Sequence, residues 1–371
     1  MLLLVTVFFL SLYALLIFFY FYHWLRTKEF IPGTASATHI SVIVAARNEE
    51  KNIKALLNAL SVQTYSPNHF EVIIVNDFST DRTADNVAPF LSHRVQLIQP
   101  EVTPGKSSKK KAIEAGVKNA KGELIVVTDA DCIPGKEWLS QISCFQQTHN
   151  SMFIAAPVKL KTNSSLLGIF QSLDFITLQG ITAASAQANV HSMCNGANLA
   201  YQSSVFFEVE GFSGIDKLAS GDDMLLMYKI WKKYPEGVHY LKNKKAIVET
   251  EPMHTWKDFF LQRKRWSSKA SYYQDWRISL VLLFVYLFNL FFFVLLAACV
   301  YDSKYLSTLV LYVIGKLLIE TPMVYAVAKF FDQQRLIIYF PFLQPLHIIY
   351  TVVVGFVSQF GTYSWKGRNT K

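Results

Sequence analysis

Residues 122–135 read GELIVVTDADCIPG and join a run of β-forming residues to two closely spaced carboxylates. The run at residues 124–127 is too short for a helix and is typical of a strand buried on both faces. Asp129 and Asp131 follow at once, and side chains at i and i+2 of an extended segment point to the same side. Since ligands of open α/β sheets bind outside the carboxyl ends of the strands, a ligand is expected at these two carboxylates.

Paired aspartates of this kind offer oxygen ligands, which suit Mg²⁺ or Mn²⁺ with a substrate diphosphate completing the coordination shell. Two such residues alone are equally compatible with a solvated turn at the end of a strand. The remainder of the chain has to decide between these interpretations.

Apolar residues are concentrated at the two ends of this chain of 371 residues, which is 51% hydrophobic and has a positive mean hydropathy. Residues 2–22 are uncharged and long enough to span a bilayer. They lack a basic leading segment and a small-residue cleavage site, so they predict an anchor rather than a signal peptide. Further apolar stretches cover residues 278–300, 306–331 and 336–360.

Charged residues beside the apolar stretches indicate the topology. Arg26 and Lys28 follow the first stretch directly, which places the next segment in the cytoplasm. Basic residues at 366, 368 and 371 favour a cytoplasmic tail, whereas three crossings after a cytoplasmic domain would put the tail outside. The total therefore stays open between three and four spans. We predict a transmembrane helix (1–24), a cytoplasmic domain (32–255), an interfacial helix (256–277), a transmembrane region of two to three spans (278–362) and a basic tail (363–371).

The net charge of +9 is spread along the chain. There is no stripe of Lys and Arg interleaved with aromatic residues, so nucleic acid is not predicted as a partner. Anionic lipid head groups and phosphorylated substrates explain the basic balance better. The four cysteines, at 132, 144, 194 and 299, have neither CxxC nor metal-site spacing and are interpreted as reduced thiols.

Alternating strands and helices are predicted through the first half of the chain. Strands are expected at residues 39–46, 70–75, 94–98 and 123–128, with Asn48 as the N-cap of the helix after the first strand. The order β-α-β-α-β-α-β predicts an α/β fold with a mostly parallel, twisted sheet and flanking helices. In a parallel sheet the polar groups that follow the strands converge on one edge. The GxGxxG and GxxxxGK[ST] patterns are absent, which argues against a dinucleotide site and a P-loop.

The second half contains four features of interest. Residues 152–160 are expected to form one further strand, which ends near Pro157. Residues 165–188 are expected to form a long helix that either lies on a membrane, lines an acceptor groove or packs in the core. Residues 219–227, ASGDDMLLM, place Asp222 and Asp223 at a helix start, where carboxylates are stabilised and commonly act as caps. Lys316 and Glu320, at i and i+4 in an apolar stretch, are predicted to pair.

Several of these segments together resemble family 2 glycosyltransferases, whose catalytic domain has the nucleotide-sugar-binding GT-A fold. The resemblance covers roughly residues 38–270. The segments are VIVAARNEEKNI, VNDFSTDRT with Asn76 in place of the first Asp of a DDxSxDxT pattern, TDAD, GANLAY, GDD and QRKRW, in the family's order.

The resemblance implies roles for individual residues on the donor side. Arg47, Asn48 and Glu49 are expected near the nucleotide base and ribose, Asp77 on the base, Lys106 toward the phosphates, and Asp129 and Asp131 on the nucleotide and its Mg²⁺ or Mn²⁺. The neighbouring Lys109, Lys110 and Lys111 are interpreted as a solvated basic helix face.

On the acceptor side, the resemblance makes Asp223 the general base of an inverting displacement, with Asp222 beside it. QRKRW at residues 262–266 resembles the QxxRW motif of membrane-integrated members. It implies that Gln262 and Arg265 reach the diphosphate and that Trp266 stacks near the acceptor.

These observations predict an integral protein of the bacterial inner membrane with a cytoplasmic catalytic domain. It is expected to move a sugar from a nucleotide-diphosphate donor, with UDP favoured, to a lipid or membrane-associated glycan. A processive synthase that extrudes its polymer is the alternative, and a membrane protein that binds nucleotide sugars without turnover is a third reading.

Overall fold

The computed structural model describes residues 1–33, 37–102, 108–190, 193–215, 221–268 and 275–360, with the backbone of 363–365 and 368–370. The chain divides into two compact units. We call them the helical unit, which comprises Met1–Arg26, Thr162–Ala184 and Pro252–Tyr363, and the sheet unit, which comprises Thr27–Lys161, Ser185–Glu251 and Ser364–Lys371.

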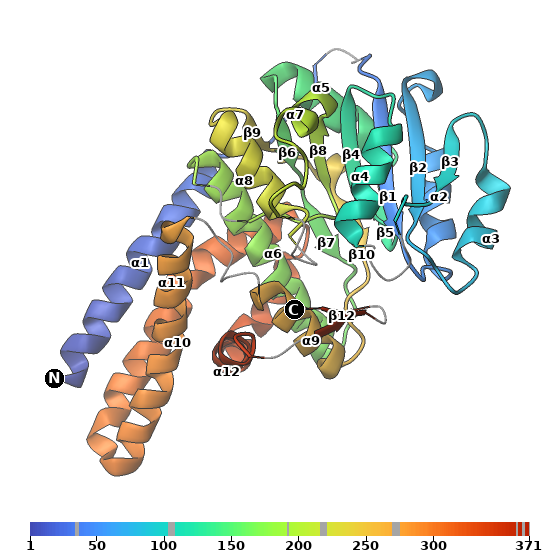
Figure 1. Cartoon of the computed structure of the whole chain (residues 1–371). Helices are drawn as coiled ribbons and strands as arrows, with labels where there is room; N and C mark the ends of the chain where they lie inside the picture. Colours follow the sequence, from blue (N-terminus) through green and yellow to red (C-terminus); the bar gives the residue numbers. More distant parts are fainter. Residues whose placement is uncertain are drawn as a thin grey trace. The chain divides into compact units, whose positions relative to one another are not determined.

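A seven-stranded sheet forms the centre of the sheet unit, in the order β3-β2-β1-β4-β8-β6-β9 (Figure 1). The first four strands are mutually parallel, whereas β8 runs antiparallel to both of its neighbours and β9 is parallel to β6. The predicted mostly parallel sheet is therefore confirmed. The strands are β1 (Ile40–Ala46), β2 (Phe70–Asn76), β3 (Val95–Ile98), β4 (Leu124–Asp129), β6 (Phe153–Ala155), β8 (Leu199–Gln202) and β9 (Val238–Tyr240).

Helices cover this sheet, and α4 (Lys109–Asn119) packs closely upon it. A Cβ added at Gly116 of this helix would lie 2.5 Å from Ile43 Cγ2 and 3.2 Å from Val75 Cγ2. The close approach fixes α4 against the buried faces of β1 and β2.

The other elements of the sheet unit are shorter. They are α2 (Ile53–Ser61), η1 (Pro67–His69), α3 (Thr83–Val87), η2 (Ala88–Phe90), α5 (Trp138–His149), α7 (Ser203–Glu208), α8 (Met224–Lys233) and η3 (Lys244–Ala246). A small sheet contains β5 (Cys132–Pro134), β10 (Val248–Thr250) and β7 (Val158–Leu160), and β11 (Tyr363–Trp365) pairs with β12 (Arg368–Thr370). The four cysteines, all within the described residues, form no disulfide.

The prediction of one strand at residues 152–160, with its end near Pro157, is wrong in one respect: a second strand follows, so the segment forms β6 and β7 in two different sheets. The change of sheet occurs at Ala156 and Pro157. Ala156 N donates to the Asn198 carbonyl at 3.0 Å, and the Pro157 carbonyl accepts from Asn198 Nδ2 at 2.8 Å. Proline cannot donate to a continuing ladder, and a buried asparagine takes over the pairing at this point.

The predicted N-cap at Asn48 is also wrong. The helix α2 begins four residues later than that capping position allows, at Ile53, with Asn52 as its N-cap. Asn48 has a left-handed backbone with φ of 53°, and its Oδ1 accepts a hydrogen bond from Thr80 N at 2.8 Å. Asparagine tolerates this conformation, so here it bridges two loops instead of capping a helix.

Long apolar helices form most of the helical unit. They are α1 (Leu2–Arg26), α6 (Leu166–Gln187), α10 (Trp276–Tyr301), α11 (Leu306–Phe330) and α12 (Phe340–Val357), with α9 (Trp256–Ser267), η5 (Ser303–Tyr305) and η6 (Gln334–Tyr339) as further elements. Helices α1, α6, α10 and the segments Ser303–Phe330 and Gln334–Val357 are long and apolar enough to cross a membrane.

Helix α6 differs from the other candidate spans in its burial. Of its most apolar window 72% is buried, compared with 11–33% for the other four. A Cβ at Gly180 of α6 would lie 2.4 Å from Val327 Cγ2 of α11, so the two helices pack closely. Of the two roles predicted for this helix, the structure favours core packing.

The predicted pair of Lys316 and Glu320 is confirmed, with Nζ 2.6 Å from Oε1. Gln344 of α12 joins both residues: it accepts from Lys316 Nζ at 2.8 Å and donates to Glu320 Oε2 at 2.7 Å. The Tyr13 hydroxyl of α1 donates to the same carboxylate. This buried network therefore ties α1, α11 and α12 together and gives each Glu320 oxygen a donor.

Replacing Gly122 by Ala tests the packing of the deciding stretch. The added methyl group would lie 2.5 Å from Ser41 N, 2.7 Å from Ile40 C and 2.8 Å from the His39 oxygen, all main-chain atoms that cannot rotate away. We expect Gly122→Ala to lower the free energy of unfolding by about 1–3 kcal/mol, the usual cost of overpacking, in denaturant titrations. Gly33→Ala, which meets nothing within 4 Å, is the control; equal stability of the two variants would contradict the expectation.

Candidate active site

The carboxyl ends of the parallel strands meet at one edge of the large sheet. The register pairs Ala46 of β1 with Asn76 of β2, and Ala45 of β1 with Asp129 of β4. The polar segments that follow these strands therefore leave the sheet side by side, as the sequence predicted.

Arg47, directly after β1, is directed at the loop after β2. Its Nη1 donates to the carbonyls of Asp77 at 2.7 Å and Phe78 at 3.2 Å. Asp77 N in turn donates to the Ala46 carbonyl at 2.8 Å. A charged donor on backbone carbonyls holds the second loop against the first, and Arg47 has this structural task besides any contact with a ligand.

Asn48 and Glu49 extend the same connection through their backbone. Asn48 N donates to Ser79 Oγ at 3.1 Å, and Glu49 N donates to Thr83 Oγ1 at 2.8 Å. Asn76, where the family pattern has an Asp, accepts from Ser79 N at 3.0 Å and so caps the turn. The structure brings together all the residues predicted near the base and ribose, with Asp77 only 2% exposed.

Lys109, at the start of α4, lies between the two acidic motifs. Its Nζ is 2.6 Å from Asp129 Oδ1 and 3.2 Å from Asp222 Oδ2. Burial alone would lower the pKa of this ammonium, but the two carboxylates outweigh burial and raise the pKa above its ordinary value. The lysine is thus a fixed positive charge that neutralises the edge.

Asp223 is the N-cap of α8 and is held through both carboxylate oxygens. Oδ1 accepts from Met224 N at 2.8 Å and Oδ2 from Gly196 N at 3.2 Å. A Cβ at Gly196 would lie 3.1 Å from Lys109 Nζ and 3.3 Å from Asp222 Oδ2. The GANLAY and GDD segments and α4 therefore converge on a single point.

Hydrogen bonds of two buried polar side chains, Thr128 and Asn198, hold the segment around Gly196 in place. Thr128 Oγ1 donates to the Ala197 carbonyl at 2.9 Å, which ties the end of β4 to the GANLAY segment. Asn198 accepts from Trp138 Nε1 at 2.9 Å and donates to the Ala246 carbonyl at 2.9 Å. The segment that contains Gly196 is fixed by these bonds.

Asp129, Asp131 and Cys132 have ligand atoms that lie within 4.8 Å of one another. Burial, followed by the charges of the two aspartates, raises the pKa of the Cys132 thiol well above its ordinary value, and the thiol donates to Asp131 Oδ1 at 3.6 Å. A neutral thiol is a poor metal ligand, whereas the carboxylate oxygens fit Mg²⁺ or Mn²⁺.

Lys109 is the residue that sequence reasoning missed. The interpretation of a solvated basic face is wrong for Lys109 and for Lys110, which is 1% exposed and donates to the Ile215 carbonyl at 2.5 Å. Lys106, predicted to reach the phosphates, lies outside the described residues. The sequence does indicate that some of these lysines are buried. Three consecutive lysines stand at the start of a helix that must pack on a buried sheet, so their side chains cannot all face water.

Gln262, Arg265 and Trp266 lie on α9 of the helical unit. The Trp266 ring lies over the guanidinium of Arg263, with 4.2 Å between the ring centroid and Cζ. Arg263, which the predictions passed over, is buried and forms an ion pair of 2.6 Å with Asp174 of α6.

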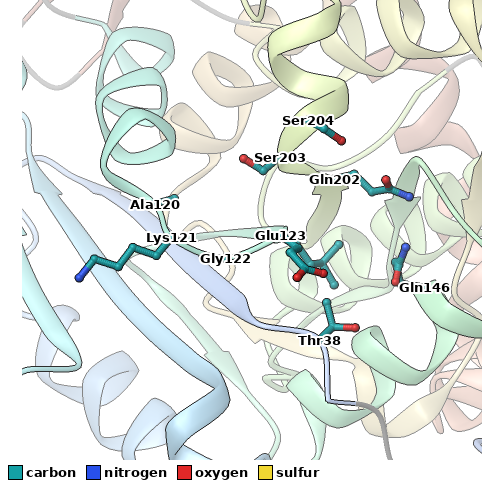
Figure 2. Close-up of a pocket in the computed structure, with 10 residues that line it drawn as sticks. Thr38, Ala120, Lys121, Gly122, Glu123, Gln146, Gln202, Ser203 and Ser204 are labelled. Carbon is teal, nitrogen blue, oxygen red and sulfur yellow. The ribbon is translucent and has the colours of Figure 1, made fainter.

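A pocket of about 420 Å³ opens at the other end of β4, beside residues 121–124. Figure 2 shows Glu123, Gln146 and Gln202 grouped there while the Lys121 side chain extends away from them. Because β4 runs from Leu124 to Asp129, this pocket is separated from the carboxylate edge by the length of the strand.

Residues 37–269 match the family described as "Glycosyltransferase like family 2", which is more than half of the chain. The chain belongs to this family. Its sheet with flanking helices is the GT-A fold, as the sequence predicted. The mannosyltransferase PcManGT from Pyrobaculum calidifontis, solved with GDP-Man and Mn²⁺, has a similar fold: the TM-score is 0.58 over 97% of this chain and all of that chain, at 15% identity.

Curated relatives match at low identity and over part of their length. A probable glycosyltransferase of Bacillus subtilis, YdaM, is 27% identical over 265 residues, which are 68% of this chain and 61% of YdaM. The poly(ribitol-phosphate) β-N-acetylglucosaminyltransferase TarS of Staphylococcus aureus is 33% identical over 120 residues, which are 32% of this chain and 21% of TarS. The chain thus spans about three fifths of the first relative and a fifth of the second.

Replacing Lys109 by Met tests the electrostatic role of the lysine. The variant leaves Asp129 and Asp222 facing each other without their cation, and breaking a buried ion pair from one side is strongly destabilising. We expect the free energy of unfolding at pH 7 to fall by about 3 kcal/mol in denaturant titrations. Lys118→Met, on the same helix, removes an exposed pair with Glu114 and should cost no more than about 0.5 kcal/mol. Equal losses would refute the role.

Proposed function

We propose that this chain is a membrane-bound, metal-dependent, inverting glycosyltransferase. The observation that supports the proposal most directly is the convergence of Asp129, Asp222 and Asp223 on Lys109 and Gly196 at the carboxyl edge of the sheet. An enzyme that handles a nucleotide diphosphate needs positive charge and acidic metal ligands beside a base, and the described residues of the sheet unit supply them at this edge.

The donor is a nucleotide-diphosphate sugar, with UDP favoured. Its base and ribose lie beside Arg47, Asn48, Glu49 and Asp77, and Asp129 and Asp131 hold the Mg²⁺ or Mn²⁺. When bound, the divalent ion neutralises charge on the diphosphate. The structure of the mannosyltransferase PcManGT holds Mn²⁺ and a GDP-linked sugar, so GDP is the rival nucleotide to test.

Transfer is a single displacement in which Asp223 is the general base. Its carboxylate accepts the proton of the acceptor hydroxyl, the hydroxyl oxygen bonds to the anomeric carbon, and the bond from that carbon to the diphosphate oxygen breaks with its electron pair. Attack opposite the leaving group inverts the anomeric configuration. Lys109, beside Asp222, stabilises the departing diphosphate, and the resemblance of QRKRW implies the same role for Gln262 and Arg265.

The acceptor is a lipid or a membrane-associated glycan, and Trp266 stacks near it. Helices α1, α10, α11 and α12 span the bacterial inner membrane, with 278–362 as the C-terminal region. The sheet unit is cytoplasmic, because Arg26 and Lys28 follow the first span directly.

A processive synthase is the second candidate, because QRKRW resembles the motif of membrane-integrated members and a named relative is one. The poly-β-1,6-N-acetyl-D-glucosamine synthase of Staphylococcus epidermidis is 24% identical over 194 residues, which are 52% of this chain and 45% of that protein. Products of uniform short length on a gel support single addition, whereas a ladder of long chains supports the synthase. Binding of a nucleotide sugar without release of nucleotide would instead support the non-catalytic reading.

Replacing Asp223 by Asn tests the general base. The amide preserves the shape of the side chain but cannot take a proton, so we expect kcat to fall by about 10²–10⁴-fold with donor KM little changed. Release of nucleoside diphosphate from UDP- and GDP-sugars, in detergent with lipid extract, is the measurement. Asp85→Asn, at an exposed carboxylate of α3, is the control and should keep wild-type turnover. Full activity of Asp223→Asn would remove Asp223 from this role.

Replacing Asp131 by Ala tests the metal site. The variant keeps the fold, because the side chain follows a strand rather than filling the core, but it loses a carboxylate ligand. We expect turnover with Mg²⁺ or Mn²⁺ to fall to background while the unfolding midpoint without metal stays within a few degrees of wild type. Titration of Mn²⁺ followed by its electron paramagnetic resonance signal measures binding directly. Unchanged Mn²⁺ affinity in the variant would show that the ion binds elsewhere.

A further inference from the structure

Arg263, inside the QRKRW segment, forms a buried ion pair between two helices of the helical unit. Its side chain is 2% exposed, and its Nη2 lies 2.6 Å from Oδ2 of Asp174 on α6, whose side chain is 7% exposed. Although Arg263 lies in the middle of a predicted substrate-binding segment, its side chain is buried against α6. It is therefore not positioned to contact a substrate itself.

Aromatic rings on the same face of α9 enclose the guanidinium. Its Cζ lies 5.0 Å from the centroid of the Phe259 ring and 4.2 Å from that of Trp266. These residues stand at i−4 and i+3 from Arg263 and therefore share its face of the helix. Trp266 also contacts Phe175 of α6, with 6.1 Å between ring centroids.

The chain just before α9 is fixed to α6 as well. The amide of Gln171 donates to the Met253 carbonyl at 2.9 Å and accepts from Met253 N at 3.0 Å. The two hydrogen bonds of the Gln171 side chain set the position of α9 along α6, and the ion pair sets the rotation of α9 about its own axis.

That rotation decides where the neighbouring side chains point. Successive residues of an α-helix are about 100° apart around its axis, so Gln262 lies about 100° from Arg263 and Arg265 about 160° from it. Because Arg263 faces α6, Arg265 points away from that helix and Gln262 points to the side of it, and both are partly exposed.

We propose that Arg263 and Asp174 are positioning residues, which fix the rotation of α9 and with it the directions in which Gln262 and Arg265 point. This inference rests on the proposed function, in which those two side chains stabilise the leaving group. A misplacement of about 1 Å at a reacting group is enough to cost about 10²-fold in rate.

The test has to separate orientation from stability. Removing one partner of a buried ion pair leaves an unpaired charge and destabilises, whereas replacing both partners by apolar residues of similar size is often neutral. The variant Asp174→Leu/Arg263→Met therefore keeps the packing and removes the directional pair. A second variant, Arg263→Lys, keeps the charge but loses the planar, forked geometry.

The experiment is a cycle of four full-length proteins: the wild type, Asp174→Leu/Arg263→Met, Gln262→Ala/Arg265→Ala, and the combination of all four substitutions. We measure kcat and donor KM from nucleoside diphosphate release, and the unfolding midpoint. Each double variant is expected to lower kcat about 10–100-fold. The kcat of the combined variant is expected to be no more than about 3-fold below that of the less active double variant, because both changes remove the same interaction. Arg263→Lys should fold and lower kcat several-fold.

A second ion pair of the helical unit, whose arginine is more exposed than Arg263, is the control. Asp275 and Arg277, at the start of α10, form a pair of the same 2.6 Å length. Asp275→Asn/Arg277→Met should leave kcat at the wild-type value.

Four results would overturn the inference. Retained kcat in Asp174→Leu/Arg263→Met, with kcat lost in Gln262→Ala/Arg265→Ala, would do so and would leave the proposed function standing. Losses that multiply in the combined variant would show that the ion pair acts independently of Gln262 and Arg265. Full activity of Gln262→Ala/Arg265→Ala would refute their role at the diphosphate, and the inference would fall with it. If the apolar variant does not fold, wild-type kcat in a folded Arg263→Lys overturns the inference.

Discussion

A shared cation is the interaction on which the catalytic edge depends. Asp129 at the end of β4 and Asp222 before α8 are far apart in sequence, and both lie against the Lys109 ammonium. Two carboxylates at such short range repel each other unless a positive charge lies between them, and the repulsion grows as water is excluded. The two acidic loops can lie this close together because α4 places the Lys109 ammonium in contact with both carboxylates.

The sheet order explains why the lysine is available there. Helix α4 leads into β4, which lies beside β1, and Gly116 lets the helix approach the sheet closely. The start of α4 is consequently held at the same edge as the ends of β1 and β4. Asp223 receives its place from the same construction, since its carboxylate is bonded to Gly196 N, next to the segment that Thr128 anchors to β4.

The features that could be predicted from the sequence are those that depend on residues close together in the chain. The aliphatic runs of β1, β2 and β4 fix their strands by composition alone, and the parallel order then places Asp77 and Asp129 on one edge. The second strand, β7, could not be predicted, because a distant residue, Asn198, supplies the bonds that replace the ladder through its main-chain carbonyl and its side-chain amide. The prediction that Asn48 caps a helix is wrong for a similar reason, because its hydrogen-bond partner, Thr80, belongs to another loop. Lys109 and Arg263 were missed because burial of a charge depends on partners that lie at least 20 residues away in the chain.

Both units use the same device, a buried or partly buried cation that joins separate segments through carboxylates. Lys109 does so in the sheet unit and Arg263 does so in the helical unit, whereas Lys316 pairs with a carboxylate of its own helix and reaches α12 through the Gln344 amide. Such pairs contribute little net stability, because the cost of desolvating two charges offsets most of their attraction, but an unpaired member is expensive. A helix position that breaks the ion pair is therefore much less stable than the position that forms it. A helix held in this way is restricted to one rotation and one register, and that restriction is what a site needs if it is to bring side chains from β4, α4 and α8 to bear on one leaving group.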